Sequence, residues 1–251
     1  MALAKEAAQL LVAHRPAAAL TGAGVSVASG VPDFRSPGGI WERFDPEEYA
    51  TAEALAFDPD RTWLFFAALF ELVRQIRPNP AHAALAELES LGVLRTVITQ
   101  NIDGLHQAAG SGDVVEYHGG PRLTCMGCGA AIAGLSPAQW DAAREGRAPR
   151  HACGAVIRPE VVLFGEEIPP EAMRRSLDAV RGANALLVVG TSAQVWPAAG
   201  LPEMAARQGA PVIEVNLEET PVSRGAALSI RGDAGDVLPE IAAQVRRLLG
   251  R

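Results

Sequence analysis

The chain has 251 residues, and its content of 49% hydrophobic and 20% charged residues suits one large folded domain, or one domain with a small inserted module. The net charge of −7 argues against nucleic acid as a main partner, because binding phosphates requires a basic face, but it leaves a basic peptide open as a substrate. No apolar run has membrane-spanning length and the N-terminal residues lack the pattern of a secretory signal. We therefore expect a cytoplasmic protein that binds neither membrane nor nucleic acid.

The first predicted elements are an amphipathic helix over 3–14 and a short buried strand over Ala17–Leu20. In the loop after this strand, Gly22 and Gly24 permit a tight turn and a close approach of the backbone to a ligand. Ser26 opens a short helix, whose N-terminus suits a pyrophosphate. Because the third glycine of G-x-G-x-x-G is missing, the pattern alone predicts either a nucleotide or anion loop or a strand–helix turn without a ligand.

The residues after this loop favour a ligand. Asp33, Phe34 and Arg35 place an acid, an aromatic ring and a guanidinium side by side, and a packed core does not favour unpaired charges. The segment 37–59 is rich in glycine, proline and acids, which is typical of a functional lid. The helix predicted over Arg61–Arg77 carries too many aromatic residues for a solvent face, so its aromatic stripe belongs to the core or to the wall of a pocket.

Polar side chains follow the next predicted strand. A helix over Ala81–Leu91 leads to a buried strand over Val93–Thr99, and Gln100, Asn101 and Asp103 come directly after it. In open parallel sheets ligands bind outside the carboxyl ends of strands, so these side chains suit a sugar or a carboxamide. The alternative is that Asn101 or Asp103 caps the helix that follows.

A histidine and three cysteines mark the middle of the chain. The short strand predicted over Val114–Gly120 carries His118 between small residues at its end. Cys125 and Cys128 form a C-x-x-C pair, which in a reducing compartment indicates metal or redox chemistry, and an odd number of cysteines makes no disulfide framework. With Cys153, residues 121–160 have the character of an inserted module.

The last third has the clearest α/β pattern. Two strand–turn–helix units in succession predict a parallel sheet with right-handed crossovers. The predicted elements are a helix over 170–181, a strand over Ala185–Val189, a helix over 198–207, a strand over Pro211–Val215, a strand over Leu228–Ile230 and a closing helix that starts at Gly232–Ala234.

Nine motifs occur here in the order and approximate spacing of the sirtuins, the NAD-dependent protein deacylases, and the chain resembles this family from Ala17 to Ile241. The motifs are GAGVS, GVPDFR, GGIW, TQNID, YHGG, C-x-x-C, VVLFGE, GTS and NLE. The resemblance, closest to the bacterial type, implies an α/β fold: a Rossmann-like parallel sheet with helices on both faces plus a small inserted zinc-type module, with the active site in the cleft between the two. We expect 1–36, 90–118 and 161–251 to form the large domain, and 37–89 and 119–160 the small domain.

The resemblance also implies an activity and its residues. Sirtuins break the nicotinamide–ribose bond of NAD and pass ADP-ribose to the amide oxygen of an acylated lysine. The positions that match the family's NAD site are Gly22, Ala23, Gly24, Ser26, Asp33, Phe34, Arg35, Trp41, Gln100, Asn101, Ile102, Asp103, Gly190, Thr191, Ser192, Asn216, Leu217, Glu218 and Ala234. The positions that match the strand that binds substrate peptide by backbone pairing are Val162, Leu163, Phe164 and Gly165, with the acyl-lysine passing between Phe164 and His118.

The chemistry of the residues agrees with this assignment. Breaking the glycosidic bond needs an oriented leaving group and a shielded centre, which Asn101, Asp103 and the lid segment can supply. The following step needs a general base for a ribose hydroxyl, and a histidine such as His118 has an ordinary pKa of about 6.5, near working pH. Three other histidines lie in or beside predicted helices, and we interpret them as structural: His14, His82 and His106.

The metal ligands depart from the family pattern. The sirtuins carry two cysteine pairs, but Arg150 occupies the place of the first cysteine of the second pair, beside His151. Structural zinc takes four ligands, so Cys125, Cys128 and Cys153 need His151 as a fourth. The alternative is that zinc has been lost and apolar packing holds the module together.

The acyl preference and the competing functions follow from residues as well. Sirtuins that prefer succinyl or malonyl lysine carry a tyrosine and an arginine on the helix after the lid, whereas this helix reads LFFAALFELV and offers an apolar wall of Phe65, Phe66, Leu69 and Phe70. A buried carboxylate without a partner is unfavourable there, so we predict acetyl or longer apolar acyl groups.

Two functions other than deacylation stay open, a mono-ADP-ribosyltransferase and a non-catalytic NAD sensor. A dehydrogenase is disfavoured, because it would need the full glycine motif. We expect a monomer.

Overall fold

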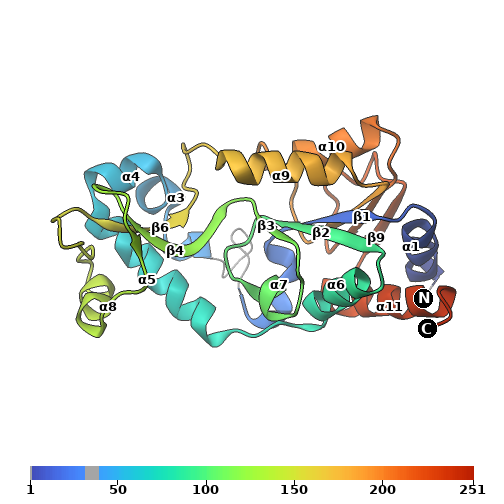
Figure 1. Ribbon diagram of the computed structural model, residues 1–251, viewed down its shortest axis with the longest axis horizontal. Helices are drawn as coiled ribbons and strands as arrows, with labels where there is room; N and C mark the ends of the chain where they lie inside the picture. The colour runs from blue at the N-terminus through green and yellow to red at the C-terminus, as the bar shows by residue number, and fades with distance from the viewer. Residues whose placement is uncertain (1, 32–39) are drawn as a thin grey trace. The chain divides into compact units, whose positions relative to one another are not determined.

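The computed structural model describes residues 2–31 and 40–251, except for the side chains of Ile40 and Trp41. The chain forms two compact units (Figure 1). Unit 1 comprises Met1–Gly30, Arg77–Tyr117 and Pro170–Arg251, and unit 2 comprises Val31–Ile76 and His118–Pro169. Among the described residues, no helix combines the length and the apolar character needed to cross a membrane.

Unit 1 is built on a sheet of six parallel strands in the order β3-β2-β1-β7-β8-β9. The strands are β1 (Ala17–Thr21), β2 (Leu94–Thr99), β3 (Val114–Glu116), β7 (Ala185–Val189), β8 (Val212–Asn216) and β9 (Leu228–Arg231). The central strands β1 and β7 are buried along their whole length, which is why their sequences, AAALT and ALLVV, are apolar runs without alternation. The chain builds the sheet outward from β1 in one direction and then in the other, so the order switches between β1 and β7.

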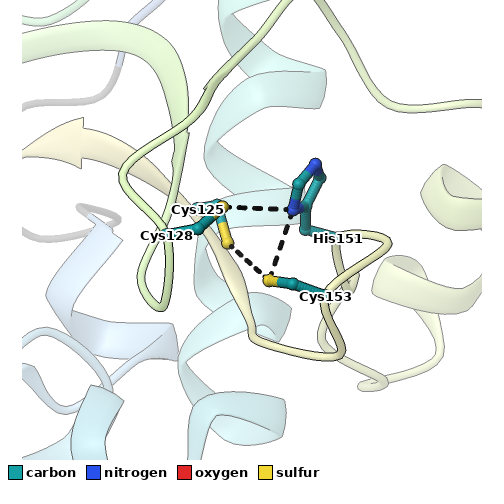
Figure 2. Close-up of side chains that lie close together, drawn as sticks. All are labelled: Cys125, Cys128, His151 and Cys153. Atoms are coloured by element: carbon teal, nitrogen blue, oxygen red, sulfur yellow. Dashed lines mark hydrogen bonds between the residues drawn. The ribbon is translucent and has the colours of Figure 1, made fainter.

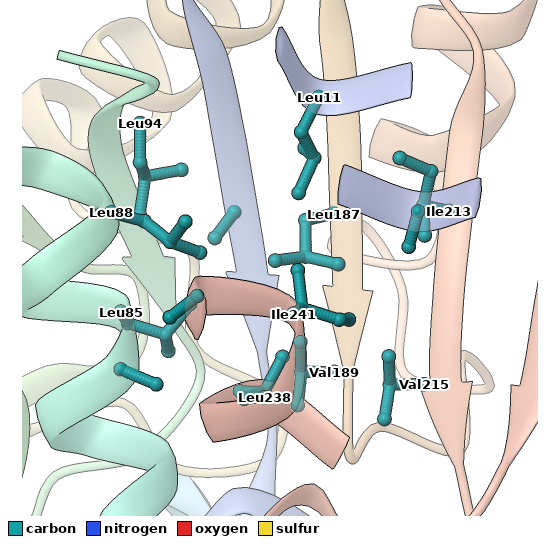
Figure 3. Close-up of a cluster of buried hydrophobic side chains, with 14 of the residues drawn as sticks. Leu11, Leu85, Leu88, Leu94, Leu187, Val189, Ile213, Val215, Leu238 and Ile241 are labelled. Carbon is teal, nitrogen blue, oxygen red and sulfur yellow. The ribbon is translucent and has the colours of Figure 1, made fainter. Parts of the chain in front are cut away.

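Helices cover both faces of this sheet. The longer ones are α1 (Ala2–Ala13), α6 (Pro80–Ser90) and α11 (Ala234–Leu248), which pack on one another, and α9 (Pro170–Arg181) and α10 (Gly200–Arg207), which lie on the other face (Figure 1). Figure 3 shows the core under the first group, where Leu85 and Leu88 of α6 and Leu238 and Ile241 of α11 meet Leu187 of β7. Burial of such side chains stabilises the unit by about 1.5–3 kcal/mol each. This arrangement confirms the predicted Rossmann-like sheet with helices on both faces.

Unit 2 combines a small antiparallel sheet with short helices. Its strands pair in the order β5-β4-β6, and the bounds are β4 (Gly119–Cys125), β5 (Ala131–Ile132) and β6 (Ile157–Val161). Its helices are α2 (Ile40–Arg43), α3 (Pro46–Tyr49), α4 (Ala52–Phe57), α5 (Pro59–Gln75) and α8 (Pro137–Arg144). Aromatic rings hold these elements together: Trp63 of α5 packs edge-to-face on Phe66 and on Trp140 of α8, and its Nε1–H donates to the carbonyl oxygen of Ile157 over 2.8 Å. Phe65, Phe66, Leu69 and Phe70 are all buried. The aromatic stripe of α5 is therefore buried, as expected for the core or for the wall of a pocket.

The structure differs from the sequence prediction in its short elements. The segment expected to be a lid with little structure is helical where it is described, because Asp45, Thr51 and Asp58 each cap a helix that follows. The short helix predicted at Ser26 is replaced by two 3₁₀ turns, η1 (Ala23–Val25) and η2 (Val27–Ser29). A short helix, α7 (Leu105–Ala108), follows the polar loop after β2.

The boundaries of the two units differ from the predicted domain boundaries mainly at two places, and Val31 and His118, which we predicted in the large domain, also belong to unit 2. The helix α6, which we predicted within the small domain, belongs to unit 1 because it packs on α11 and β2. Residues 161–169 belong to unit 2 because Val161 pairs with Gly119 of β4 and Phe164 pairs with Thr51.

Candidate functional site

The carboxyl ends of β1 and β7 carry the predicted glycines, and these glycines contact each other. The N–H of Gly24 donates to the carbonyl oxygen of Gly190 over 2.8 Å. A Cβ on Gly24 would lie 2.7 Å from the Cα of Gly190, and a Cβ on Gly190 would lie 2.4 Å from the backbone nitrogen of Val25. Thr191 likewise leaves no room for a Cβ on Gly22. The glycines thus let two loops meet at the switch point of the sheet, which is where open α/β sheets bind their ligands.

The polar residues after β2 reach back to this loop. Asn101 Nδ2 donates to the carbonyl oxygen of Gly22 and to Ser26 Oγ, both over 3.1 Å. Ser26 Oγ in turn donates to Asp103 Oδ2 over 2.7 Å, while Asp103 Oδ1 accepts from the N–H of Leu105 over 3.0 Å. One carboxylate oxygen of Asp103 therefore accepts from the first N–H of α7, whose N-cap is Gly104, and the other contacts the glycine loop, while ligand binding by this segment stays a prediction.

A second set of contacts joins the ends of β2, β7 and β8. Gln100 Nε2 donates to Thr191 Oγ1 over 2.9 Å, and Asn216 Nδ2 donates to the carbonyl oxygen of Thr191 over 3.2 Å. Leu217 follows with 59% of its side chain exposed, and Ala234 begins α11 after the cap residue Asp233. The remaining predicted positions of unit 1 lie in the same loops: Ala23, Ile102, Ser192 and Glu218. One edge of the sheet therefore gathers the predicted NAD residues of this unit.

Two residues of this edge make contacts with the glycine loop that were not predicted: Asn79, and His82, which we interpreted as structural. Asn79, the N-cap of α6, donates through Nδ2 to the carbonyl oxygen of Val25 over 2.8 Å and to Ser29 Oγ over 3.0 Å. His82 is buried, with its Nε2 at 3.4 Å from Ser26 Oγ and its Nδ1 accepting from the N–H of Asn79. The motif N-P-x-H at the helix start indicated this capping box but not its second contact, with the glycine loop.

Buried histidines stay neutral at this edge. Burial lowers the pKa of His82, and the carboxylate of Asp103 offsets this only in part. Burial, followed by the neighbouring His82, lowers the pKa of His106 to about 3, and His106 Nε2 lies 2.9 Å from Thr21 Oγ1. Neutral rings can exchange hydrogen bonds with hydroxyl groups without placing a charge in the core.

Unit 2 carries the predicted base and the predicted peptide strand side by side. His118 lies in the turn between β3 and β4, is half-buried, and accepts through its carbonyl oxygen from the N–H of Val162 over 2.9 Å. Phe164 exchanges backbone hydrogen bonds of 2.9 Å with Ala50 and Ala52, and its side chain is 47% exposed. The segment 162–165 is thus held beside His118 with an aromatic ring at the surface.

The same unit assembles the predicted metal ligands (Figure 2). The three cysteine sulfurs and one histidine nitrogen lie within 4.8 Å of one another, with Cys125 Sγ at 3.4 Å from Cys153 Sγ and His151 Nδ1 at 3.3 Å from Cys153 Sγ and 3.4 Å from Cys128 Sγ. Sulfur ligands around a tetrahedral zinc ion lie about 3.8 Å apart, so the spacing and the donor set fit zinc. The N–H groups of Cys128 and Gly127 lower the pKa of Cys125 to about 6, which favours the thiolate that a metal requires.

Four predicted site residues cannot be compared with the structure. Asp33, Phe34 and Arg35 lie outside the described residues, and so does the side chain of Trp41. Their assignment to the NAD site stays a prediction.

The fold and the site define a class: a doubly wound parallel-sheet protein with a nucleotide-type glycine loop and an inserted Cys₃His module. A family model described as the Sir2 family matches residues 22–197, and the chain belongs to this family. The NAD-dependent protein deacylase 2 of Pyrobaculum aerophilum is 46% identical over 243 residues, which cover 96% of each chain.

Two solved structures are similar over almost the whole chain. A crystal structure of a Sir2 homologue in complex with NAD is 41% identical, covers 98% of this chain and 94% of its own, and has a TM-score of 0.88. A Sir2 variant with a deacetylated p53 peptide and 3′-O-acetyl ADP ribose is 36% identical, covers 98% of both chains and has a TM-score of 0.86.

Proposed function

We propose that this protein is an NAD-dependent protein lysine deacylase, which transfers the acyl group of an acyl-lysine to ADP-ribose and releases nicotinamide. The observation that carries this is the sheet edge of unit 1, where Asn101, Asp103 and Ser26 form one hydrogen-bonded group beside the glycine loop. The family supports it, since a relative is a deacylase that depends on NAD and another holds NAD itself.

The residues divide the reaction between them. Asn101 and Asp103 are held by the glycine loop and by α7, so they orient the ribose and the carboxamide of NAD with little freedom to lose on binding. His118 acts as general base and takes the proton of a ribose hydroxyl, whose oxygen attacks the former amide carbon of the acyl-lysine; the bond from that carbon to the lysine nitrogen then breaks and the amine leaves. The strand 162–165 holds the peptide by backbone pairing.

The alternative activity, ADP-ribosyl transfer to a protein, would use the same NAD residues as deacylation and would differ in the group that accepts the ADP-ribose. A relative in complex with acetyl ADP ribose and a deacetylated peptide favours acyl transfer, because that pair of molecules is what deacetylation leaves behind. A non-catalytic sensor is disfavoured because Asn101, Asp103 and His118 are all present.

Zinc has a structural role in this proposal. Cys125, Cys128, His151 and Cys153 would hold the ion, and all four ligands come from the protein, which leaves no open position for chemistry. We also propose cytoplasmic residence, because cysteines that form no disulfide suit a reducing compartment. We further propose acyl-lysine proteins as the partners, a monomeric state, and no binding of nucleic acid.

The test is an acetyl-lysine peptide incubated with the purified protein, with and without NAD, and followed by mass. We expect NAD-dependent loss of one acetyl group and the appearance of O-acetyl ADP-ribose. His118→Ala should lower the rate by about 10²–10⁴-fold, as for other general bases, while His14→Ala, which changes an exposed histidine, should leave it unchanged. A peptide left intact by the wild-type protein with NAD, for every acyl group tried, would overturn the proposal; ADP-ribosylated peptide would indicate the alternative.

The same assay tests the acyl preference. The buried face of α5 offers aromatic and aliphatic side chains, and a succinyl carboxylate would lose its hydration there without gaining a partner. We therefore propose that acetyl and longer apolar acyl groups are removed faster than succinyl. Faster removal of succinyl from matched peptides would show that a cation reaches the acyl group from elsewhere.

A further inference from the structure

The segment proposed to bind the substrate peptide is closed at both ends by one ion pair. Arg158 lies in β6, before the segment, and Glu166 lies directly after it. Arg158 Nη1 contacts Glu166 Oε1 over 2.5 Å, and Nη2 donates to Oε2 over 2.9 Å. Only 17% and 24% of the two side chains are exposed. The contact is a bidentate, largely buried pair, the geometry in which a guanidinium and a carboxylate interact most strongly.

Both partners also bind backbone atoms, Glu166 within the segment and Arg158 at the residue directly before it. Arg158 Nη2 donates to the carbonyl oxygen of Val161 over 2.7 Å, and Glu166 Oε2 accepts from the N–H of Leu163 over 2.9 Å. Burial alone would raise the pKa of Glu166, but the hydrogen bonds from Arg158 and from the Leu163 N–H bring that pKa below its ordinary value. The carboxylate therefore remains ionised and keeps both contacts at neutral pH.

The pair encloses a tight turn that carries the exposed aromatic ring. The N–H of Glu166 donates to the carbonyl oxygen of Leu163 over 3.0 Å, which closes a four-residue turn, and Gly165 at its third position has a φ of +87°. Phe164 occupies the second position of this turn, and 47% of its side chain is exposed. The direction of that ring and of the neighbouring backbone is thus set by the turn, by the backbone hydrogen bonds of Phe164 to Ala50 and Ala52, and by the contact of the ion pair with the Leu163 N–H.

We propose that Arg158 and Glu166 are positioning residues for the peptide substrate, which fix the segment 162–165 in the conformation that pairs with an acyl-lysine peptide. The inference rests on the proposed function. It differs from ordinary stabilisation because the pair contacts the backbone of the segment itself, so its loss changes the shape of the binding edge while β4 and β6 remain paired.

A second ion pair of the same sheet provides a matched control. Arg122 of β4 contacts Glu160 of β6 over 3.0 Å, and the two side chains are 64% and 43% exposed. Such exposed pairs contribute about 0–1 kcal/mol. A change at Arg122 therefore removes an arginine–glutamate contact from the same sheet and leaves the pair of Arg158 and Glu166 in place.

The experiment measures kcat and KM for the acetyl-lysine peptide and, separately, for NAD. The variants are Glu166→Gln, which keeps the size of the side chain and an oxygen for the Leu163 N–H, Arg158→Met, the double variant, Arg158→Lys and the control Arg122→Gln. We expect the KM for the peptide to rise about 10-fold in the two single variants, which corresponds to about 1.4 kcal/mol. The KM for NAD should change by less than about 2-fold, and the control should match the wild type.

The double variant shows whether the two residues act as one unit. We expect its peptide KM to equal that of either single variant, because the first change already removes the pair, and we expect Arg158→Lys to restore part of the affinity. Additive effects would overturn the inference, and so would an unchanged peptide KM. A parallel fall of activity toward both substrates, in proportion to the folded fraction, would show a merely structural role.

Failure of the proposed function has a different signature. A wild-type protein that removes no acyl group from any peptide contradicts the function, whereas an active wild type with unaltered variants contradicts the positioning role alone.

Discussion

Unit 1 and unit 2 reach stability by different means. Unit 1 has a continuous aliphatic core in which α1, α6 and α11 cover a parallel sheet, and its central strands are entirely buried. Unit 2 has a sheet of three strands, the shortest of two residues, with aromatic contacts at α5 and a Cys₃His cluster where β4 and the loop before β6 meet. A large core tolerates the loss of one contact, but a small module depends on each of its crosslinks.

The two candidate sites differ in the same way. The polar residues of unit 1 lie in loops at the end of a rigid sheet, and they bind one another through side chains such as Asn101 and Ser26. The peptide segment of unit 2 has no helix or long strand of its own, and it is held by backbone hydrogen bonds to His118, Ala50 and Ala52 together with the Arg158–Glu166 pair. We infer that unit 1 supplies a preformed nucleotide edge and that unit 2 needs local crosslinks to present its binding edge.

The largest expected effect is the loss of a metal ligand. Cys153→Ser, or removal of zinc by a chelator, should cost unit 2 several kcal/mol, because zinc binding in small modules contributes on the order of 10 kcal/mol to folding. Hydrogen exchange should show lost protection over 121–157 and kept protection in β7. Met126→Ala changes an exposed residue of the same loop and should preserve both. Protein purified without chelator that holds well under one zinc per chain would contradict this prediction.

A cavity in the core of unit 1 should have the next largest effect. Leu187 of β7 is fully buried in the aliphatic cluster (Figure 3), so Leu187→Ala should lower the free energy of unfolding by about 2–5 kcal/mol. Urea unfolding measures this, and Leu3→Ala, at a side chain that is 46% exposed, should change it by less than about 0.5 kcal/mol. If the two variants lost equal stability, the contrast between a continuous core and a crosslinked module would fail.

The smallest expected effect concerns a buried carboxylate in unit 1. Glu214 of β8 is 1% exposed and accepts hydrogen bonds from Ser223 and Ser229, both over 2.6 Å, and from Thr220 and Arg231. Burial alone would raise the pKa of Glu214, but these hydrogen bonds bring it below its ordinary value. Glu214→Gln should cost about 1–3 kcal/mol at neutral pH, because an amide NH₂ would face hydroxyl donors.

The pH dependence of this effect has a definite sign. The folded pKa of Glu214 is lower than its unfolded value of about 4.3, so its contribution is fully present above that pH and is lost as the pH falls through the folded pKa. The stability difference between the wild type and Glu214→Gln should therefore shrink below about pH 4. A difference that stayed constant from pH 7 to pH 3 would show that the carboxylate charge contributes nothing.

Long apolar and periodic segments were predictable from the sequence, and short elements were not. The strand β7 was predicted with its observed bounds, and α9 likewise, because a buried run and an amphipathic period are local patterns. The helices α3 and α4 span 4 and 6 residues, too few to show a period, and they are marked only at their starts, by the caps Asp45 and Thr51 and by acids in the first turn. The predicted start of α5, Arg61, lies inside the observed helix, which begins at Pro59 after the cap Asp58.

By itself the sequence determined the order of the motifs, the family resemblance and the parallel sheet, and it named four candidate metal ligands while leaving the loss of zinc as an alternative. The tertiary structure decided what these residues contact: Gly24 against Gly190, Asp103 between Ser26 and α7, His82 beside the glycine loop, and Arg158 against Glu166. Local propensity and periodicity depend on residues that are neighbours in the sequence, so the sequence alone is enough to recognise them. Contacts between residues such as Gly24 and Gly190 depend on strand order and register, which only the packing of the whole unit fixes.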